Sequence, residues 1–160
     1  MDLKAILKKE LTFFSNLVKK KDNLEALIRL IENENLIEDV DLLRRSIFSR
    51  EELMSTGLGL GIAVPHARIK GVENIIIAIG INKNAIDDYE SLDGTPVRIV
   101  IMIVAGEKQH REYLMLLSQM VKILKKNSMI DNLLEAEKAE EVIGLISEDF
   151  NNNHPTENPS

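Results

Sequence analysis

Two apolar runs rich in β-branched residues decide the fold class: Ile75–Ile81 reads I-I-I-A-I-G-I, and Val97–Val104 reads V-R-I-V-I-M-I-V. Neither run alternates apolar with polar side chains, so both predict strands that are buried on both faces. Between them, Leu92–Pro96 reads L-D-G-T-P, a composition typical of a tight turn. The centre of the chain therefore predicts strands that other elements cover on both sides.

Segments with helical periodicity flank these strands in the sequence. Apolar residues recur at spacings of three and four in four segments, which predict helices near 22–31, 40–53, 109–124 and 139–146. Asp22 is expected to cap the first of these helices. A short opening helix near Leu3 is also predicted, whereas Leu11–Val18 fits either a helix or a strand. Strands that alternate with helices indicate a layered α/β domain.

The length of 160 residues fits a single domain, which we assign to residues 1–150. The last ten residues read N-N-N-H-P-T-E-N-P-S and contain no large apolar side chain. Residues 151–160 are therefore expected to form a disordered polar tail. His154 falls in this tail, and we interpret it as an incidental exposed residue.

Composition excludes several classes of function. The chain has no Cys, which excludes disulfides, zinc-thiolate sites, iron–sulfur clusters and thiol nucleophiles. Its formal net charge of −6 is unfavourable for nonspecific binding of nucleic acid or anionic lipid. No apolar run approaches the roughly 18 residues of a membrane span, and the charged N-terminus does not look like a secretory signal. We expect a cytoplasmic protein without direct membrane insertion.

The segment Ser55–His66, S-T-G-L-G-L-G-I-A-V-P-H, is richer in glycine than the rest of the chain. Its three glycines stand at alternate positions, which indicates a sharp turn or a backbone that another segment approaches closely. Pro65 restricts the backbone directly before His66. The imidazole is therefore expected on a stiff segment next to a turn.

The spacing within this segment argues against three common chemistries. The pattern G-x-G-x-G lacks the spacing of a dinucleotide site and the G-K-[ST] ending of a phosphate loop. Ser55 and Asp93 are conceivable partners of His66 in a hydrolase triad, but the G-x-S-x-G elbow is absent. No histidine or carboxylate stands three or four residues after His66, so no local metal site is expected.

The stretch Arg50–Arg68, R-E-E-L-M-S-T-G-L-G-L-G-I-A-V-P-H-A-R, resembles a known signature. It is similar to that of fructose/mannitol-type enzyme IIA domains of the bacterial phosphoenolpyruvate-dependent sugar phosphotransferase system. Ile86–Val97, I-D-D-Y-E-S-L-D-G-T-P-V, resembles the turn into a core strand of that family. The resemblance covers most of the chain and implies a single α/β domain with a layered mixed β-sheet flanked by helices.

The resemblance implies that His66 is the phosphorylated residue, through Nε2, and that Arg50 lies beside it and stabilises the phosphoryl group. The phosphocarrier protein HPr would donate the group, and an enzyme IIB partner would receive it for sugar uptake, with no cofactor and no metal. A neutral imidazole is nucleophilic near pH 7, and a guanidinium matches phosphate oxygens. Without the resemblance, an ion pair with Glu51 or Glu52 is the simpler interpretation of Arg50.

One position departs from the family pattern. The family usually has a second histidine at the start of the helix after the last core strand, and Tyr113 stands at that position here. His110 stands three residues earlier, so on a helix both side chains would share a face. Three interpretations stay open: the Tyr113 hydroxyl bonds to the phosphohistidine, His110 reaches the site, or neither contributes and Tyr113 only packs.

A second function is compatible with the same residues. The family includes nitrogen-related regulatory domains, which bind target proteins according to their phosphorylation state. Such a domain would still be phosphorylated on His66, but it would pass the group to no sugar. The two functions share the first chemical step and differ in the partner that follows.

Overall fold

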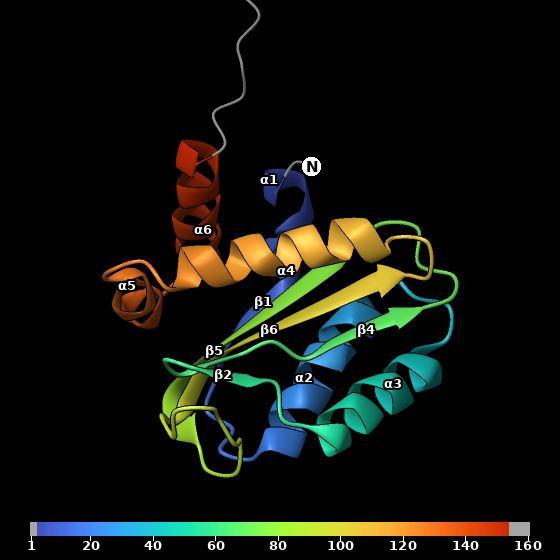
Figure 1. Cartoon of the computed structure of the whole chain (residues 1–160), viewed down its shortest axis with the longest axis horizontal. Coiled ribbons are helices and arrows are strands. Elements are labelled where there is room, and N and C mark those ends of the chain that lie inside the picture. Colours follow the sequence, from blue (N-terminus) through green and yellow to red (C-terminus); the bar gives the residue numbers. More distant parts are fainter. Residues whose placement is uncertain (1–2, 154–160) are drawn as a thin grey trace, which may run out of the picture.

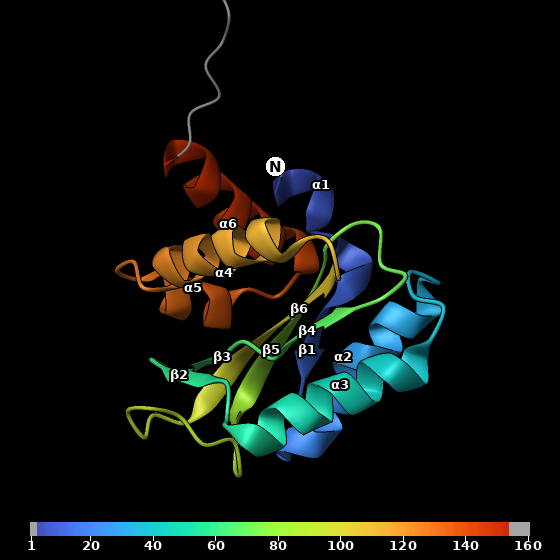
Figure 2. The ribbon, with the colours of Figure 1, turned by 45° about the vertical axis from the view of Figure 1, so that its right-hand side comes forward.

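The computed structural model describes residues 3–153, which form a six-stranded sheet between two layers of helices (Figures 1 and 2). The helical elements are α1 (Leu3–Ile6), the 3-10 helix η1 (Lys9–Leu11), α2 (Lys20–Asn33), α3 (Val40–Leu53), α4 (His110–Leu124), α5 (Met129–Glu135) and α6 (Ala139–Asn153). The strands are β1 (Thr12–Ser15), β2 (Gly57–Gly59), β3 (Ile62–Ala63), β4 (His66–Ile69), β5 (Ile76–Ile86) and β6 (Val97–Gly106).

The long strands β5 and β6 form an antiparallel ladder at the centre of the sheet. The order along the sheet is β1-β5-β6-β3-β2, and β4 also pairs with β6. The sheet is mixed, because β1 pairs in parallel with β5, and β3 and β4 pair in parallel with β6, whereas β2 pairs with β3 in antiparallel. Every residue of β6 except Arg98 is buried, which confirms the prediction of strands covered on both faces.

Helices cover both faces of this sheet, as Figures 1 and 2 show: α1, α4, α5 and α6 lie on one side, and α2 and α3 on the other. Side chains alternate between two apolar cores along each long strand. Ile101 and Ile103 belong to the core beneath α4, whereas Val100 and Met102 belong to the core beneath α2 and α3. The predicted layered α/β domain is confirmed.

The short strands β3 and β4 follow one another along the same side of β6 and are separated only by Val64 and Pro65. Pro65 has no N–H for a sheet ladder, which explains the break between the two strands. Its carbonyl still accepts a hydrogen bond of 3.0 Å from the N–H of Ile103. This bond anchors the chain one residue before His66, which begins β4.

The glycine-rich segment folds into the β2–β3 hairpin and packs against residues 90–96. A Cβ at Gly57 would overlap the carbonyl oxygen of Glu90, so another backbone segment does approach this position closely. Gly59 and Gly61 have φ values of 103° and 81°, which glycine adopts readily. The Asp93 carboxylate accepts a 2.9 Å bond from the N–H of Leu60, which closes the turn.

Helix α2 begins at Lys20, so the prediction that Asp22 caps it is wrong. The reason is tertiary, because the N–H of Lys20 donates a 2.7 Å hydrogen bond to the carboxylate of Asp88. A side chain distant in sequence thus takes the capping role. Asp22 instead lies in the first turn, where its negative charge suits the helix dipole.

Other boundaries also differ from the predictions. The ambiguous segment Leu11–Val18 contains the strand β1, which pairs with β5. Helix α6 extends to Asn153, so the first three residues of the expected tail are helical, and residues 154–160 with His154 lie outside the described residues. Helix α5 and the strands β2, β3 and β4 have too few residues for their periodicity to be recognised.

Replacement of Gly57 by Ala is expected to destabilise the fold by about 1–3 kcal/mol, since the new methyl group meets backbone atoms of Glu90 and Ser91. Gly144→Ala is the control, because a Cβ at this helical position meets no atom within 4 Å beyond its chain neighbours and the backbone of its own helix. It should stabilise the protein by about 0.5–1 kcal/mol. Urea unfolding measures both changes, and equal effects of the two variants would contradict this account of the hairpin.

Candidate functional site

His66 is half-buried at the start of β4, and one hydrogen bond sets its tautomer. Its Nδ1 lies 2.8 Å from the carbonyl oxygen of Val64. Because a carbonyl only accepts hydrogen bonds, Nδ1 carries the proton, and the lone pair of the neutral ring is on Nε2. The imidazole is therefore presented as a nucleophile through Nε2.

The surroundings of His66 keep the ring neutral. Burial lowers the pKa of His66 below its ordinary value. The hydrogen bond to Val64 and the charge of Glu51 act in the opposite direction, and the charge of Arg50 lowers the pKa further. The net direction is downward, so the unprotonated, nucleophilic form dominates at neutral pH.

Tyr113 packs against His66 from the first turn of α4. The two ring centroids are 5.4 Å apart, and the ring planes are tilted by 44°. The Tyr113 side chain is buried, and its hydroxyl has no hydrogen-bond partner. His110 lies one turn earlier, is exposed, and makes no ring contact with His66 within residues 3–153.

Arg50 lies in the last turn of α3, close enough for its charge to act on both His66 and Tyr113. Its Nη1 donates a 2.7 Å hydrogen bond to the carbonyl oxygen of Met54, which fixes the guanidinium at the end of the helix. No ion pair joins it to Glu51 or Glu52 in the part of the chain that the structure describes. The structure therefore brings His66, Arg50 and Tyr113 together.

Glu51 is a buried carboxylate beside this site that sequence reasoning considered only as a partner for Arg50. It instead forms a 2.8 Å ion pair with Lys20 of α2. It also accepts hydrogen bonds from the hydroxyls of Thr56 and Tyr89 and from the N–H of Thr56. This polar cluster links α2 and α3 to the glycine-rich hairpin.

The cluster of Glu51 reaches the backbone that holds His66. The carbonyl of Thr56 accepts a 3.1 Å hydrogen bond from the N–H of Val64, whose own carbonyl accepts from His66. A continuous series of hydrogen bonds thus runs from the buried carboxylate to the imidazole. The only signal in the sequence was Glu51 following Arg50, and it does not reveal these partners.

Arg68 is a second residue that sequence reasoning missed. Side chains alternate along a strand, so Arg68 lies on the same face of β4 as His66, while Ala67 and Ile69 point into the opposite core. Arg68 is exposed, and its charge acts on the Tyr113 hydroxyl. The charges of two guanidinium groups, those of Arg50 and Arg68, therefore act on Tyr113, and the charge of Arg50 also acts on His66.

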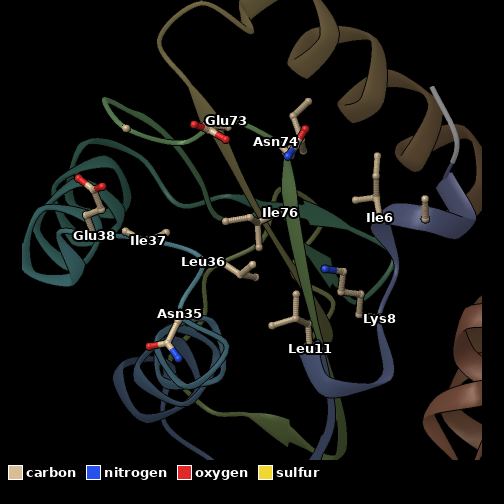
Figure 3. Close-up of a pocket in the computed structure, with 13 residues that line it drawn as sticks. Ile6, Lys8, Leu11, Asn35, Leu36, Ile37, Glu38, Glu73, Asn74 and Ile76 are labelled. Carbon is tan, nitrogen blue, oxygen red and sulfur yellow. The ribbon is translucent and has the colours of Figure 1, made fainter.

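The hollow drawn in Figure 3 lies elsewhere in the molecule. It has a volume of about 560 Å³ and lies between α1, the α2–α3 connection and the β4–β5 connection. Its lining combines apolar side chains such as Ile6 and Leu36 with Lys8, Glu38 and Glu73 at its rim, and includes none of the residues around His66. Residues 3–153 contain no cluster of side chains suited to a metal ion, and none of their helices is long and apolar enough to cross a membrane.

Comparison with known proteins gives a family match over most of the chain. The profile of the family described as "Phosphoenolpyruvate-dependent sugar phosphotransferase system, EIIA 2" matches residues 5–149. The fructose-specific EIIABC component of Bacillus subtilis is 36% identical over 131 residues, which are 81% of this chain and 20% of that protein. The chain thus spans about a fifth of the length of this relative.

Solved structures share the fold. The nitrogen regulatory protein IIA-Ntr from Neisseria meningitidis superposes with a TM-score of 0.83 at 28% identity, over 90% of this chain and 98% of that one. A chain from the complex of mannitol enzyme IIA with phosphorylated enzyme IIB from Escherichia coli superposes with a TM-score of 0.70 at 22% identity, over 89% and 97% of the two chains. The second likeness establishes the fold alone.

We expect His66 to titrate with a pKa below its ordinary value of about 6.5. NMR of its ring protons as a function of pH would measure this pKa. The unfolded chain then binds a proton at a higher pH than the folded chain does. Stability is therefore lost as the pH falls through the range between the unfolded and the folded pKa. His66→Gln should remove this part of the pH dependence, and an unchanged dependence would assign it to other groups.

Proposed function

Because the chain belongs to the EIIA 2 family of the phosphoenolpyruvate-dependent sugar phosphotransferase system, we propose that His66 accepts a phosphoryl group and passes it to a second protein. The observation that carries this proposal is the hydrogen bond from Nδ1 of His66 to Val64. It leaves the Nε2 lone pair for attack on phosphorus. The family supplies the reaction class, and this bond supplies the nucleophilic atom.

The proposed step is an in-line transfer between two proteins. Nε2 of His66 forms a bond to phosphorus while the bond between phosphorus and the donor atom of HPr breaks, and the donor leaves with that electron pair. The proton on Nδ1 stays in place, hydrogen-bonded to Val64. No general base is needed, because burial and the charge of Arg50 already favour the neutral imidazole.

Arg50 is proposed to stabilise the group in transit. Phosphoryl transfer spreads negative charge over three oxygens, and positioning and cationic donors supply most of the catalysis. The hydrogen bond to Met54 holds the guanidinium near His66 before any phosphate arrives. A group that is oriented in advance loses little freedom when it binds the anion.

Exposed apolar side chains next to the site support the proposal that other proteins bind there. Leu53 and Met54, which follow Arg50, are 85% and 62% exposed, and Leu114 and Met115 follow Tyr113. Apolar groups of this kind are typical of protein–protein contacts. We propose that HPr is the phosphoryl donor and that an enzyme IIB protein or domain is the acceptor, in the cytoplasm, for coupled sugar uptake. The mannitol enzyme IIA that was solved bound to phosphorylated enzyme IIB is in line with this proposal.

A nitrogen-type regulatory role is the second candidate. The likeness to the nitrogen regulatory protein of Neisseria meningitidis, which this chain covers almost completely, favours it. In that role the phosphorylated and unphosphorylated forms would bind a target protein differently, and no enzyme IIB would discharge the group. Incubation of the labelled protein with purified enzyme IIB separates the two roles: loss of label to IIB supports transport, and its retention supports regulation.

The first test is phosphorylation by enzyme I, HPr and phosphoenolpyruvate. Wild type should carry acid-labile phosphate, and His66→Ala should carry none while it keeps its circular dichroism spectrum. His110→Ala is the matched control, because this histidine is exposed and has no ring contact with His66. Labelling of folded His66→Ala at the wild-type rate would refute the assignment.

Loss of the Arg50 charge should slow the transfer. Arg50→Gln is expected to lower the single-turnover rate by about 10²-fold, the effect typical of removing one preorganised donor. Arg45→Gln removes the same charge from an exposed position on the same helix and should change the rate by less than about twofold. Rapid quenching with labelled HPr measures both rates, and equal rates in the two variants would exclude a specific role for Arg50.

A further inference from the structure

The hydroxyl of Tyr113 is buried without a hydrogen-bond partner. The residue is only 5% exposed. Within residues 3–153 four buried side-chain polar atoms are unpaired, and those of Asn82 and Arg98 belong to side chains that hydrogen-bond through another atom. The other two are the hydroxyls of Ser147 and Tyr113, and of these Tyr113 is the residue that contacts the ring of His66. A buried hydroxyl that makes no bond reduces stability, so its presence needs an explanation.

Packing alone does not explain the hydroxyl. The contact with His66 is made by the ring, with centroids 5.4 Å apart, and a phenylalanine ring would make the same contact. The other tyrosine of the chain shows the ordinary situation, since the hydroxyl of Tyr89 bonds to Glu51 and lies 2.8 Å from the hydroxyl of Thr56. The Tyr113 hydroxyl has no such partner in the unphosphorylated chain.

The missing partner is most simply an anion. Arg68 shares a face of β4 with His66, and Arg50 lies in the last turn of α3. The charges of both guanidinium groups act on the Tyr113 hydroxyl. Burial nevertheless raises the pKa of Tyr113 to about 12, so the hydroxyl remains a proton donor at neutral pH.

From this convergence we infer that the Tyr113 hydroxyl donates a hydrogen bond to the phosphoryl group on Nε2 of His66, in an anion site completed by Arg50 and Arg68. The inference rests on the proposed function, because it assigns to Tyr113 a contact with the group that His66 carries. A phosphoryl group has three oxygens, and the three donors come from α3, β4 and α4. The donor that costs stability in the free protein gains its bond only when phosphate is present.

The test compares Tyr113→Phe with wild type in two measurements on the full chain. Urea unfolding of the unphosphorylated protein should show equal or higher stability for the variant, since it loses an unpaired hydroxyl. The single-turnover rate of phosphorylation by HPr should fall roughly 10- to 100-fold, as expected for loss of a hydrogen bond to a charged group. The KM for HPr should not change, because the ring and the surface around it are kept.

Thr12→Val is the control, in a strand that β5 and β6 separate from β4. It removes a hydroxyl that donates a 3.1 Å hydrogen bond to the carbonyl of Lys8, so it should lower stability while it leaves the rate of phosphorylation within about twofold of wild type. The two variants thus have opposite expected effects. The control variant loses stability and keeps its rate of phosphorylation, whereas Tyr113→Phe keeps its stability and is phosphorylated more slowly. Arg68→Gln should lower the rate in the same direction as Tyr113→Phe, and Arg68→Lys should restore part of it.

Phosphoramidate, a small phosphoryl donor, separates failure of this inference from failure of the proposed function. It labels an accessible imidazole without HPr: the Nε2–phosphorus bond forms as the phosphorus–nitrogen bond of the donor breaks and ammonia leaves. Wild-type rates in Tyr113→Phe with both donors would overturn the role of Tyr113 and leave His66 as the carrier. A folded wild type that neither donor labels would overturn both proposals.

Discussion

The antiparallel ladder between β5 and β6 is the constraint on which the rest of the structure depends. Its side chains are apolar on both faces, so the ladder is stable only when helices cover it on both sides, and the chain supplies α2 and α3 to one face and α4 to the other. β6 also pairs with β3 and β4, and it receives the carbonyl of Pro65. The position of His66 is therefore fixed by the strand that holds the two cores together.

The charged groups around His66 affect both the binding of an anion and the protonation of the imidazole. In the proposed reaction Arg50 binds the incoming phosphoryl group, and before that group arrives the charge of Arg50 helps to keep the imidazole unprotonated. Glu51 has the opposite effect on the imidazole, but it lies against Lys20 and shares its oxygens with two hydroxyls and an amide. A buried carboxylate is tolerated beside the nucleophile because it is paired and hydrogen-bonded.

The sequence predicted those features that depend on neighbouring residues, such as the two long strands, the tight turn before Pro96 and the close backbone approach in the glycine-rich segment. It failed where a distant group decides the outcome: Asp88 sets the start of α2, and pairing with β5 makes Thr12–Ser15 a strand. Within the site, the family signature pointed to His66 and Arg50. Arg68 emerged only once strand alternation in β4 was known, and the choice between Tyr113 and His110 required the packing of α4.

The placement of the aromatic rings has an optical consequence. The chain has no Trp and two tyrosines, so its intrinsic emission comes from Tyr89 and Tyr113. One ring packs against the imidazole, and the hydroxyl of the other bonds to the carboxylate whose charge acts on that imidazole. A change of charge at His66 is therefore expected to alter the emission of Tyr113, with no tryptophan emission to mask it.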